Sequence, residues 1–245
     1  MRVVISAGGT GGHIYPALAI INKIKEMEPN SEFLYIGTTN RMEKDLIPSM
    51  GYRYEGIEVT GFKRKLTLDN FKTITNFLNA IKRCKIIIKD FDPDIVIGCG
   101  GYVTAPVIYA AKKLGKKTFI HEQNSVVGLA NKFLARYTDK IGVSFESTIK
   151  DFPKGKAELT GNPCSEKALS IKKTTKEKLG VAKDKKLVLI VMGSLGSRTI
   201  NDKIFSFIDK FRSKNYSVII VTGNSYYERV KDKKVPSNVK VLPFI

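Results

Sequence analysis

Short runs of β-branched apolar residues alternate with longer amphipathic stretches along most of this chain. The apolar runs cover residues 2–6, 32–36, 94–97, 117–120 and 140–143, and the amphipathic stretches include residues 16–27 and 104–114. Apolar strands that alternate with helices are typical of a parallel sheet covered by helices on both faces. The sequence therefore predicts an α/β fold with right-handed crossover connections.

The alternation weakens between residues 144 and 186 and then restarts. A turn at residues 161–163 precedes a lysine-rich stretch, and three further strands are predicted at residues 186–191, 217–222 and 239–242. A length of 245 residues suits two modest domains. We expect these to be residues 1–162 and residues 163–245. Three strands with no helix after the last expose much apolar surface, so the second domain is expected to be incomplete.

The chain is strongly basic: 42 Lys and Arg against 23 Asp and Glu give a formal charge of +19. Such a charge favours an anionic partner, which can be a nucleic acid, a membrane face or a substrate. Three widely spaced cysteines favour neither a disulfide framework nor a zinc site. No signal-peptide pattern and no run of about 18 apolar residues occurs, so a cytosolic protein without membrane-spanning helices is expected.

A glycine-rich segment, Gly8-Gly9-Thr10-Gly11-Gly12-His13, separates the first strand from a helix whose first turn is expected to hold Pro16. Glycines let backbone N–H groups approach a ligand, and a helix N-terminus favours an anion. The simpler alternative is a tight strand–helix turn. The G-G-x-G-G spacing differs from the G-x-G-x-x-G of nicotinamide enzymes, and the second strand ends without the acidic residue that they need.

Two further polar loops, residues 98–104 and 121–125, also follow predicted strands. Loops after parallel strands share one edge of the sheet, where ligands bind. Both histidines lie in such loops, and His13 is a candidate general base because neutral imidazole accepts a proton near neutral pH. His121 fits a surface or capping residue equally well. Asp92-Pro93-Asp94 precedes its strand and is interpreted as a turn, so no metal site is predicted.

Residues 71–89 combine apolar side chains at helical spacing with many basic ones. The apolar set is Phe71, Ile74, Phe77, Leu78, Ile81 and Ile88, and the basic set is Lys72, Lys82, Arg83, Lys85 and Lys89, after Phe62-Lys63-Arg64-Lys65. Such a helix can settle on an anionic bilayer. It can equally be a core helix with a solvated basic face. Nucleic-acid binding is not expected, because no helix-turn-helix or RNA-binding signature is present and the chain has no Trp.

Five motifs in this order resemble the MurG family, the membrane-associated N-acetylglucosaminyltransferases of peptidoglycan synthesis. They are residues 8–17, 100–102, 121–124 with 128–131, 161–163 and 193–196. The resemblance implies a glycosyltransferase-B architecture, in which two Rossmann-like parallel-sheet domains face across a cleft, with no cofactor and no obligatory metal. It covers the family's N-terminal domain and the first part of its C-terminal domain.

The resemblance also implies an activity. The family is an inverting hexosyltransferase that moves GlcNAc from UDP-GlcNAc to the MurNAc C4 hydroxyl of lipid I, giving lipid II and UDP. The expected partners are therefore UDP-GlcNAc, lipid I, the anionic cytoplasmic face of the cell membrane, where the protein would be peripheral, and other proteins of cell-wall synthesis. Cell shape and cell division depend on this process.

Positions in the family's motifs carry over to residues of this chain. His13 falls on the acceptor side as general base or positioning group, with Tyr102 and Glu122 as further catalytic candidates. The implied substrate contacts are Thr10, Gly11, Gly12, Asn124, Ser165, Ser194 and Ile245. Ser165 stands where many members have an arginine, and Ile245 is expected to pack against the uracil.

The family continues beyond the position of Ile245 with the acidic residue that holds the ribose and a glutamine near the donor sugar. We therefore expect a truncated donor domain. The alternative function is a catalytically inactive protein that binds the acceptor or an anionic membrane only.

Overall fold

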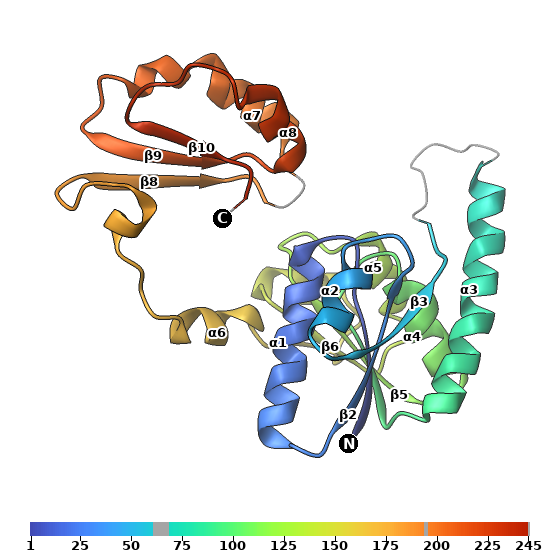
Figure 1. Ribbon diagram of the computed structural model, residues 1–245. Helices are drawn as coiled ribbons and strands as arrows, with labels where there is room; N and C mark the ends of the chain where they lie inside the picture. The colour runs from blue at the N-terminus through green and yellow to red at the C-terminus, as the bar shows by residue number, and fades with distance from the viewer. Residues whose placement is uncertain (61–68, 194–195, 245) are drawn as a thin grey trace. The chain divides into compact units, whose positions relative to one another are not determined.

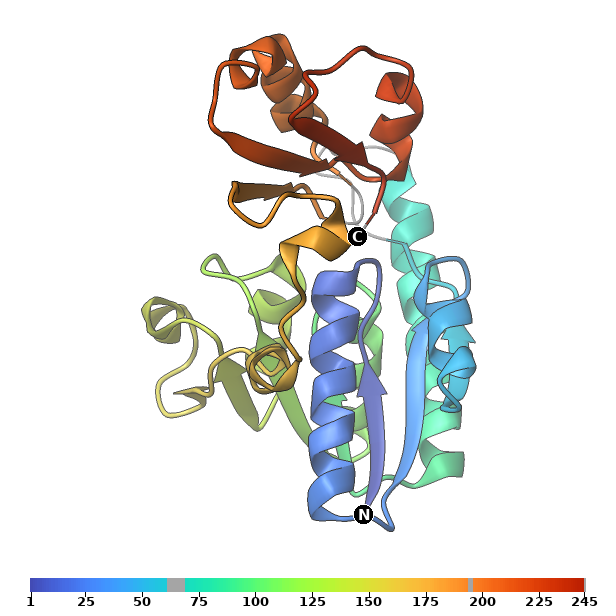
Figure 2. The same ribbon diagram turned by 60° about the vertical axis from the view of Figure 1, so that its left-hand side comes forward.

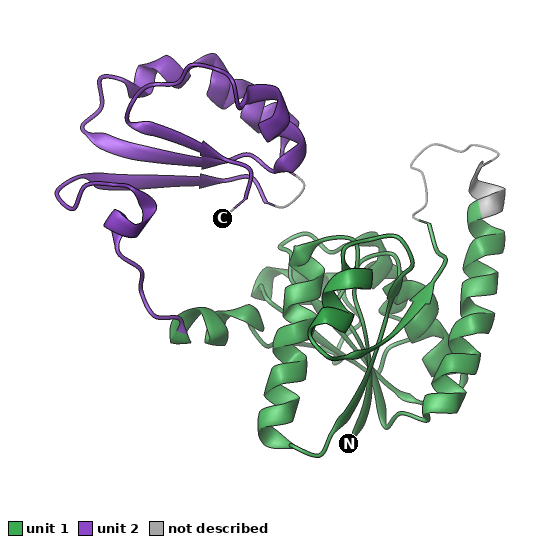
Figure 3. Cartoon of the chain, in the orientation of Figure 1, with its two compact units in different colours: residues 1–170 green, residues 171–245 purple. Residues whose placement is uncertain are grey.

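The computed structural model describes residues 1–60, 69–193 and 196–244, and only the backbone of residues 69–72. The chain forms two compact units, Met1–Ser170 and Ile171–Ile245 (Figure 3). The sequence placed the division after Asn162. The structure places it after α6 (Cys164–Ser170), because α6 packs on α1 (Gly11–Met27), where Lys23 Nζ lies 2.6 Å from a carboxylate oxygen of Glu166.

The first unit is built on one parallel seven-stranded sheet, with strand order β3-β2-β1-β4-β5-β6-β7. Figure 1 labels β2, β3, β5 and β6 of this sheet. The strands are β1 (Arg2–Ser6), β2 (Glu32–Thr38), β3 (Arg53–Ile57), β4 (Ile95–Gly98), β5 (Lys117–Glu122), β6 (Lys140–Val143) and β7 (Ala157–Leu159). Every neighbouring pair is parallel. The predicted α/β fold is confirmed for this unit.

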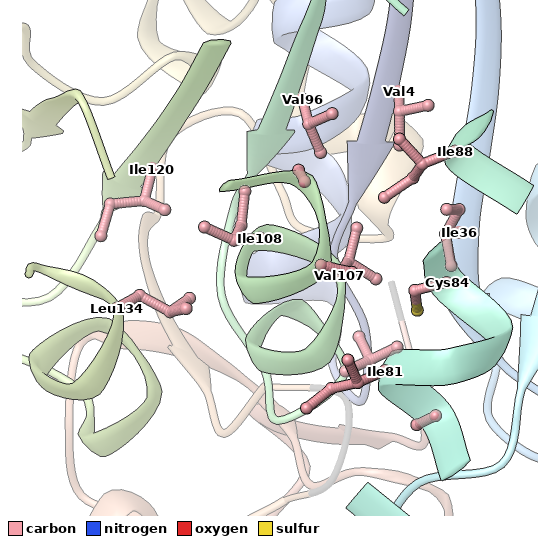
Figure 4. Packing of buried hydrophobic residues seen from close by; sticks show 14 of the residues in the cluster. Val4, Ile36, Ile81, Cys84, Ile88, Val96, Val107, Ile108, Ile120 and Leu134 are labelled. Atoms are coloured by element: carbon pink, nitrogen blue, oxygen red, sulfur yellow. The ribbon is translucent and has the colours of Figure 1, made fainter. Parts of the chain in front are cut away.

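Helices cover both faces of this sheet, as buried apolar strands require. One face packs against α1 and α2 (Glu43–Ser49), and the other against α3 (Asp69–Phe91), α4 (Thr104–Lys113) and α5 (Leu129–Leu134). Strand β1 shows the alternation: Val3 and Ile5 belong to the core under α1, whereas Val4 belongs to the opposite core. Figure 4 shows this opposite core, with Val4 of β1 and Ile88 of α3 among its labelled residues.

The topology reverses at β1. The chain runs outward from β1 to β3 and then returns to the other side of β1 to begin β4. The connections that leave β1 and β4 therefore run in opposite directions along the sheet. They start next to each other at the carboxyl ends of the two strands, where Cys99 N donates a hydrogen bond to Ser6 O over 2.8 Å. In Figure 2, β1 leads upward into the start of α1. Such a switch point is where open α/β sheets bind ligands.

The second unit holds a three-stranded parallel sheet of order β10-β9-β8. Its strands are β8 (Lys186–Val191), β9 (Tyr216–Val221) and β10 (Val239–Leu242), and its helices are α7 (Arg198–Ser206), α8 (Asn224–Val230) and the 3-10 helices η2 (Lys176–Leu179) and η3 (Ile208–Phe211). Central β9 is buried on both faces, whereas the β8 side chains Leu189 and Val191 are about half exposed.

Several predicted elements differ from the observed ones. Pro16 was predicted in the first turn of its helix. Helix α1 begins at Gly11, so Pro16 lies in the second turn. The stretch between the first two strands of the second unit forms a helix only from Arg198 to Ser206, and a 3-10 turn follows. The sequence analysis missed β3 and β7. Both are short and partly polar, and β3 reads Arg-Tyr-Glu-Gly-Ile, which lacks an apolar run.

Candidate functional site

His13 lies in the first turn of α1, immediately after the first glycine-rich loop. Its Nδ1 is 3.1 Å from the carbonyl oxygen of Gly8 and 3.5 Å from Thr10 Oγ1. A carbonyl only accepts hydrogen bonds, so Nδ1 carries the proton and donates it. In neutral imidazole Nε2 then carries the lone pair that can accept a proton, and the residue is half-buried.

The glycine-rich loop after β1 and the loop after β4, residues 98–104, lie in close contact beside His13. Gly8 N donates to Gly100 O over 3.3 Å. Gly100 has a φ of 97°, and a Cβ there would lie 2.7 Å from His13 Cδ2. Gly101 has a φ of 84°, and its Cβ would collide with the carbonyl oxygen of Gly8. Because Gly100 and Gly101 have no side chains, the loop after β4 can approach both His13 and the loop after β1.

A cavity of about 660 Å³ opens beside His13. Its walls are His13, Val59, Thr60, Phe77, Gly101, Tyr102, Ala105, Gly128, Leu129, Ala130 and Phe133. His13, Tyr102 and Thr60 supply the polar side chains, and the rest of the lining is apolar or glycine. The Tyr102 hydroxyl accepts a hydrogen bond from Arg41 Nε over 3.4 Å. The site thus joins one imidazole to a largely apolar chamber, of a volume usual for ligand pockets.

Glu122, a predicted catalytic residue, is 1% exposed and does not line this cavity. One carboxylate oxygen accepts hydrogen bonds from Asn124 N and Asn124 Nδ2, over 2.9 and 2.8 Å. The other accepts from Gly128 N and Asn131 Nδ2, both over 2.9 Å. Glu122 therefore shapes the loop after β5 and presents Asn124, whose side chain is exposed.

His121 points into the protein. It is 2% exposed, its Nε2 lies 3.0 Å from Gly161 O, and Gln123 Nε2 donates to its Nδ1 over 3.0 Å. Burial lowers the pKa of His121 below its usual value, because the low-polarity surroundings disfavour the charged ring. It ties the end of β5 to the segment after β7, so the surface alternative for His121 is wrong.

The remaining predicted site residues fall in three places. Thr10, Gly11 and Gly12 form the start of α1, where backbone N–H groups lack intrahelical partners. Ser165 is exposed in the first turn of α6. Ser194 and Ile245, together with the basic stretch 62–65, lie outside the described residues. Of the predicted set, the structure brings Thr10, Gly11, Gly12, His13 and Tyr102 together at the switch point.

The sequence did not point to Arg41 and Glu43, which follow β2, or to Phe133 in the cavity wall. Residues 41–43 follow a strand at the ligand-binding edge, the same signal that identified the other loops. Nothing in the sequence alone could place α5 beside α3, where Phe77 and Phe133 meet edge to face at 6.2 Å.

The described residues contain no group of three or more His, Cys, Asp or Glu side chains able to hold a metal ion. Asp92 pairs with Lys116, and Asp94 accepts a hydrogen bond from Arg2 N over 2.7 Å, which agrees with a turn. Burial raises the pKa of the Cys84 thiol to about 12, which makes this thiol unreactive. In the described part of the chain, no helix is both long and apolar enough to cross a membrane.

Comparison with known proteins defines the class. Residues 3–143 match the model of the glycosyltransferase family 28 N-terminal domain. A UDP-N-acetylglucosamine--N-acetylmuramyl-(pentapeptide) pyrophosphoryl-undecaprenol N-acetylglucosamine transferase of Bacillus cereus is 49% identical over 250 aligned residues, which cover 100% of this chain and 69% of the relative. A relative of the same name from Leuconostoc mesenteroides is 46% identical, with the same coverage.

Solved structures agree. MurG of Acinetobacter baumannii superposes with a TM-score of 0.69 at 27% identity, covering 100% of this chain and 68% of that one. A UDP-GlcNAc 2-epimerase of Neisseria meningitidis shares the fold, with a TM-score of 0.61 at 15% identity and coverage of 99% and 72%. The chain is therefore a glycosyltransferase of the GT-B fold. It belongs to the MurG family of UDP-GlcNAc-dependent transferases.

Proposed function

We propose that this chain moves GlcNAc from UDP-GlcNAc to the C4 hydroxyl of the MurNAc unit of lipid I, with inversion at the anomeric carbon. The names of its relatives describe this acceptor as an N-acetylmuramyl-(pentapeptide) pyrophosphoryl-undecaprenol. The observation that carries the proposal is the cavity, which sets His13 beside a chamber lined by Val59, Phe77, Leu129 and Phe133. An acceptor that joins a sugar to a polyprenyl chain needs both features.

The proposed reaction is a single displacement. The C4 hydroxyl oxygen attacks C1 of GlcNAc from the face opposite UDP, the bond from C1 to the diphosphate oxygen breaks, and its electron pair leaves with UDP. The hydroxyl proton passes to His13 Nε2, the nitrogen left free by the bond from Nδ1 to Gly8 O. Tyr102 lines the same cavity and orients the acceptor there.

The start of α1 supports the binding of an anion. Thr10, Gly11 and Gly12 place backbone N–H groups at the positive end of the helix dipole, beside His13. In this proposal they contact the donor, and Asn124, held by Glu122, contacts its sugar. Ser165, Ser194 and Ile245 stay predicted substrate contacts.

Two helices offer a surface for the anionic cytoplasmic face of the cell membrane. Ile74 and Leu78 of α3 are 46% and 52% exposed, and Leu129 of α5 is 78% exposed. The edge-to-face contact between Phe77 and Phe133 joins the two helices. The same helices carry the exposed cations Lys82, Arg83 and Lys132. Apolar side chains among lysines suit a peripheral protein on an anionic bilayer.

Helix α3 has a buried apolar side, as expected of a core helix, and further apolar residues that stay exposed. Ile81 and Ile88 pack in the core, with exposures of 8% and 0%, whereas Ile74 and Leu78 remain exposed. We call the surface of Ile74, Leu78, Leu129 and Phe133 the apolar patch.

Transfer of labelled GlcNAc from UDP-GlcNAc to a lipid I analogue tests the function, with the Bacillus cereus relative as positive control. Lipid II formed by this chain supports the proposal. Absence of product, with the acceptor analogue still bound, would establish instead the alternative of a non-catalytic acceptor-binding protein. That alternative has its own support, since the cavity is formed wholly by residues of the first unit.

A further inference from the structure

One fully buried carboxylate lies next to the first glycine loop and outside the cavity walls. Glu43, in the first turn of α2, has an exposed fraction of 0%. Its Oε2 accepts a hydrogen bond from Gly9 N over 3.2 Å. Its Oε1 accepts from Thr38 N over 3.2 Å and from Thr38 Oγ1 over 2.7 Å. One carboxylate oxygen therefore holds the end of β2, and the other holds the loop that precedes His13.

The surroundings are shaped to admit this side chain. A Cβ at Gly37 would lie 2.8 Å from Glu43 Cγ, and a Cβ at Gly8 would lie 3.0 Å from the Glu43 carboxyl carbon. Alanine at either position would push the carboxylate away. Among the described residues, Glu43 forms no ion pair, so its buried charge is compensated by these hydrogen bonds. A buried carboxylate is costly unless such donors satisfy it.

The hydrogen bonds of Glu43 and His13 meet on one peptide unit. The carbonyl of Gly8 and the N–H of Gly9 belong to the same planar amide, and they point in opposite directions when it is trans. Glu43 accepts from the N–H side, and His13 Nδ1 donates to the carbonyl side over 3.1 Å. A carboxylate bonded to the N–H polarises the amide and makes its carbonyl oxygen a better acceptor.

We propose that Glu43 is a positioning residue for His13 and acts through the Gly8–Gly9 peptide unit. The carboxylate fixes the orientation of this amide, and the amide keeps the imidazole proton on Nδ1, which leaves Nε2 free to accept the substrate proton. The arrangement is a carboxylate–histidine pair with a peptide unit between its members. The inference rests on the proposed role of His13 as proton acceptor, but it concerns a tautomer that can be measured without turnover.

Glu43→Gln is the informative substitution. The side-chain oxygen of glutamine can accept both hydrogen bonds from Thr38. The NH₂ group of the same glutamine then faces the N–H of Gly9. Two donors then face each other, the Gly8–Gly9 amide loses its anchor, and the bond from His13 Nδ1 weakens. Thr38→Val is the matched control, because it removes one bond to the same carboxylate and keeps the bond from Gly9 N.

The test uses ¹⁵N NMR of the imidazole nitrogens at about pH 8.5, above the usual titration range of histidine. The chain has two histidines, and a His13→Gln variant assigns the signals. In the unmodified protein we expect His13 to carry its proton on Nδ1. In Glu43→Gln the Nδ1 signal should shift toward the unprotonated position, while His121 in Glu43→Gln and His13 in Thr38→Val keep their tautomers.

Two results would overturn the proposal. One is a proton on Nε2 of His13 in the unmodified protein, which needs no variant to fold. The other is an unchanged His13 tautomer in folded Glu43→Gln. Where turnover is measurable, kcat of Glu43→Gln should fall roughly tenfold or more, within the range of a misplaced general base, with the KM for UDP-GlcNAc unchanged. A tautomer shift in a chain that transfers no GlcNAc would refute the proposed function and leave the positioning role standing.

Discussion

The two nitrogens of the His13 ring have different surroundings, and this difference defines what a substitution should do. Nδ1 is bound to Gly8 O, and the ring rests against Gly100 at one wall of the cavity. His13→Ala removes the proton acceptor and leaves the helix intact. We expect kcat to fall by about 10²- to 10⁴-fold, the usual worth of general base catalysis. Rapid-quench measurement of lipid II formation checks this, with UDP-GlcNAc binding as the control. Unchanged turnover would remove His13 from the mechanism.

His121 makes a separate prediction, on stability. Burial lowers its pKa in the folded state, so the unfolded chain binds a proton more readily. The free energy of unfolding should therefore be highest above the unfolded-state pKa of about 6.5, and should fall as the pH drops below that value. Urea unfolding between about pH 8 and pH 5 measures this dependence. His121→Gln should reduce it. An equally steep dependence in that variant would assign the effect to other groups.

At the scale of elements, the approach of the β1 and β4 loops determines the site. Gly101→Ala places a methyl group against the carbonyl oxygen of Gly8 at a φ of 84°. Gly115→Ala is a matched control, because Gly115 has a φ of 72° but no atom within 4 Å of its Cβ. Both variants carry a backbone strain of roughly 1–2 kcal/mol. Only Gly101→Ala should lose more stability than this and also lose turnover. Equal thermal shifts for the two variants would contradict the close approach.

The apolar patch belongs to α3 and α5. Leu78→Glu and Leu129→Glu should each weaken binding to phosphatidylglycerol vesicles by about tenfold or more, since burying one leucine contributes roughly 1.5–3 kcal/mol. Leu169→Glu, on α6, is the control, because Leu169 is 88% exposed and outside the patch. Vesicle flotation measures the effect. Equal weakening by all three variants would show that charge alone, and not the patch, attracts the membrane.

Sequence periodicity identified the elements that are buried on both sides and missed those at the edges. Strands β1 and β4 contain continuous apolar runs, so their pattern predicted them, along with the glycine loops that follow. Strand β3 is a strand because it pairs with β2. Its polar residues Arg53 and Glu55 are equally common in loops, so its own sequence does not predict a strand. Pairing partners are set by the tertiary fold, which local propensity cannot report.

The same limit applies to the site. His13 and Tyr102 were predictable because each follows or lines a glycine loop at a strand end. Glu122 has the residue type of a catalyst, but four backbone and amide donors surround its carboxylate, which only the fold reveals. Glu43 was missed for the opposite reason. Its function depends on a contact with Gly9, 34 residues away in the sequence.

At the scale of the whole molecule, the two units have separate cores. Both cores of the first unit lie within residues 1–170, and both cores of the second lie within residues 171–245. The second unit is smaller, with three strands, and on β8 the side chains of Val188, Leu189 and Val191 are 39%, 48% and 53% exposed. Fewer buried apolar side chains mean a lower local free energy of opening.

We therefore expect the two units to open independently. In amide hydrogen exchange, β8 and β10 should exchange faster than β1, β4 and β5, whose neighbours on both sides are strands. Residues 1–170 produced alone should keep the exchange protection of β1 and β4 and the His13 tautomer of the complete chain, because no core residue of that unit lies beyond Ser170. Loss of that protection in the shorter protein would mean that the first unit depends on the second, and the cavity beside His13 could then not be treated as a site of one unit.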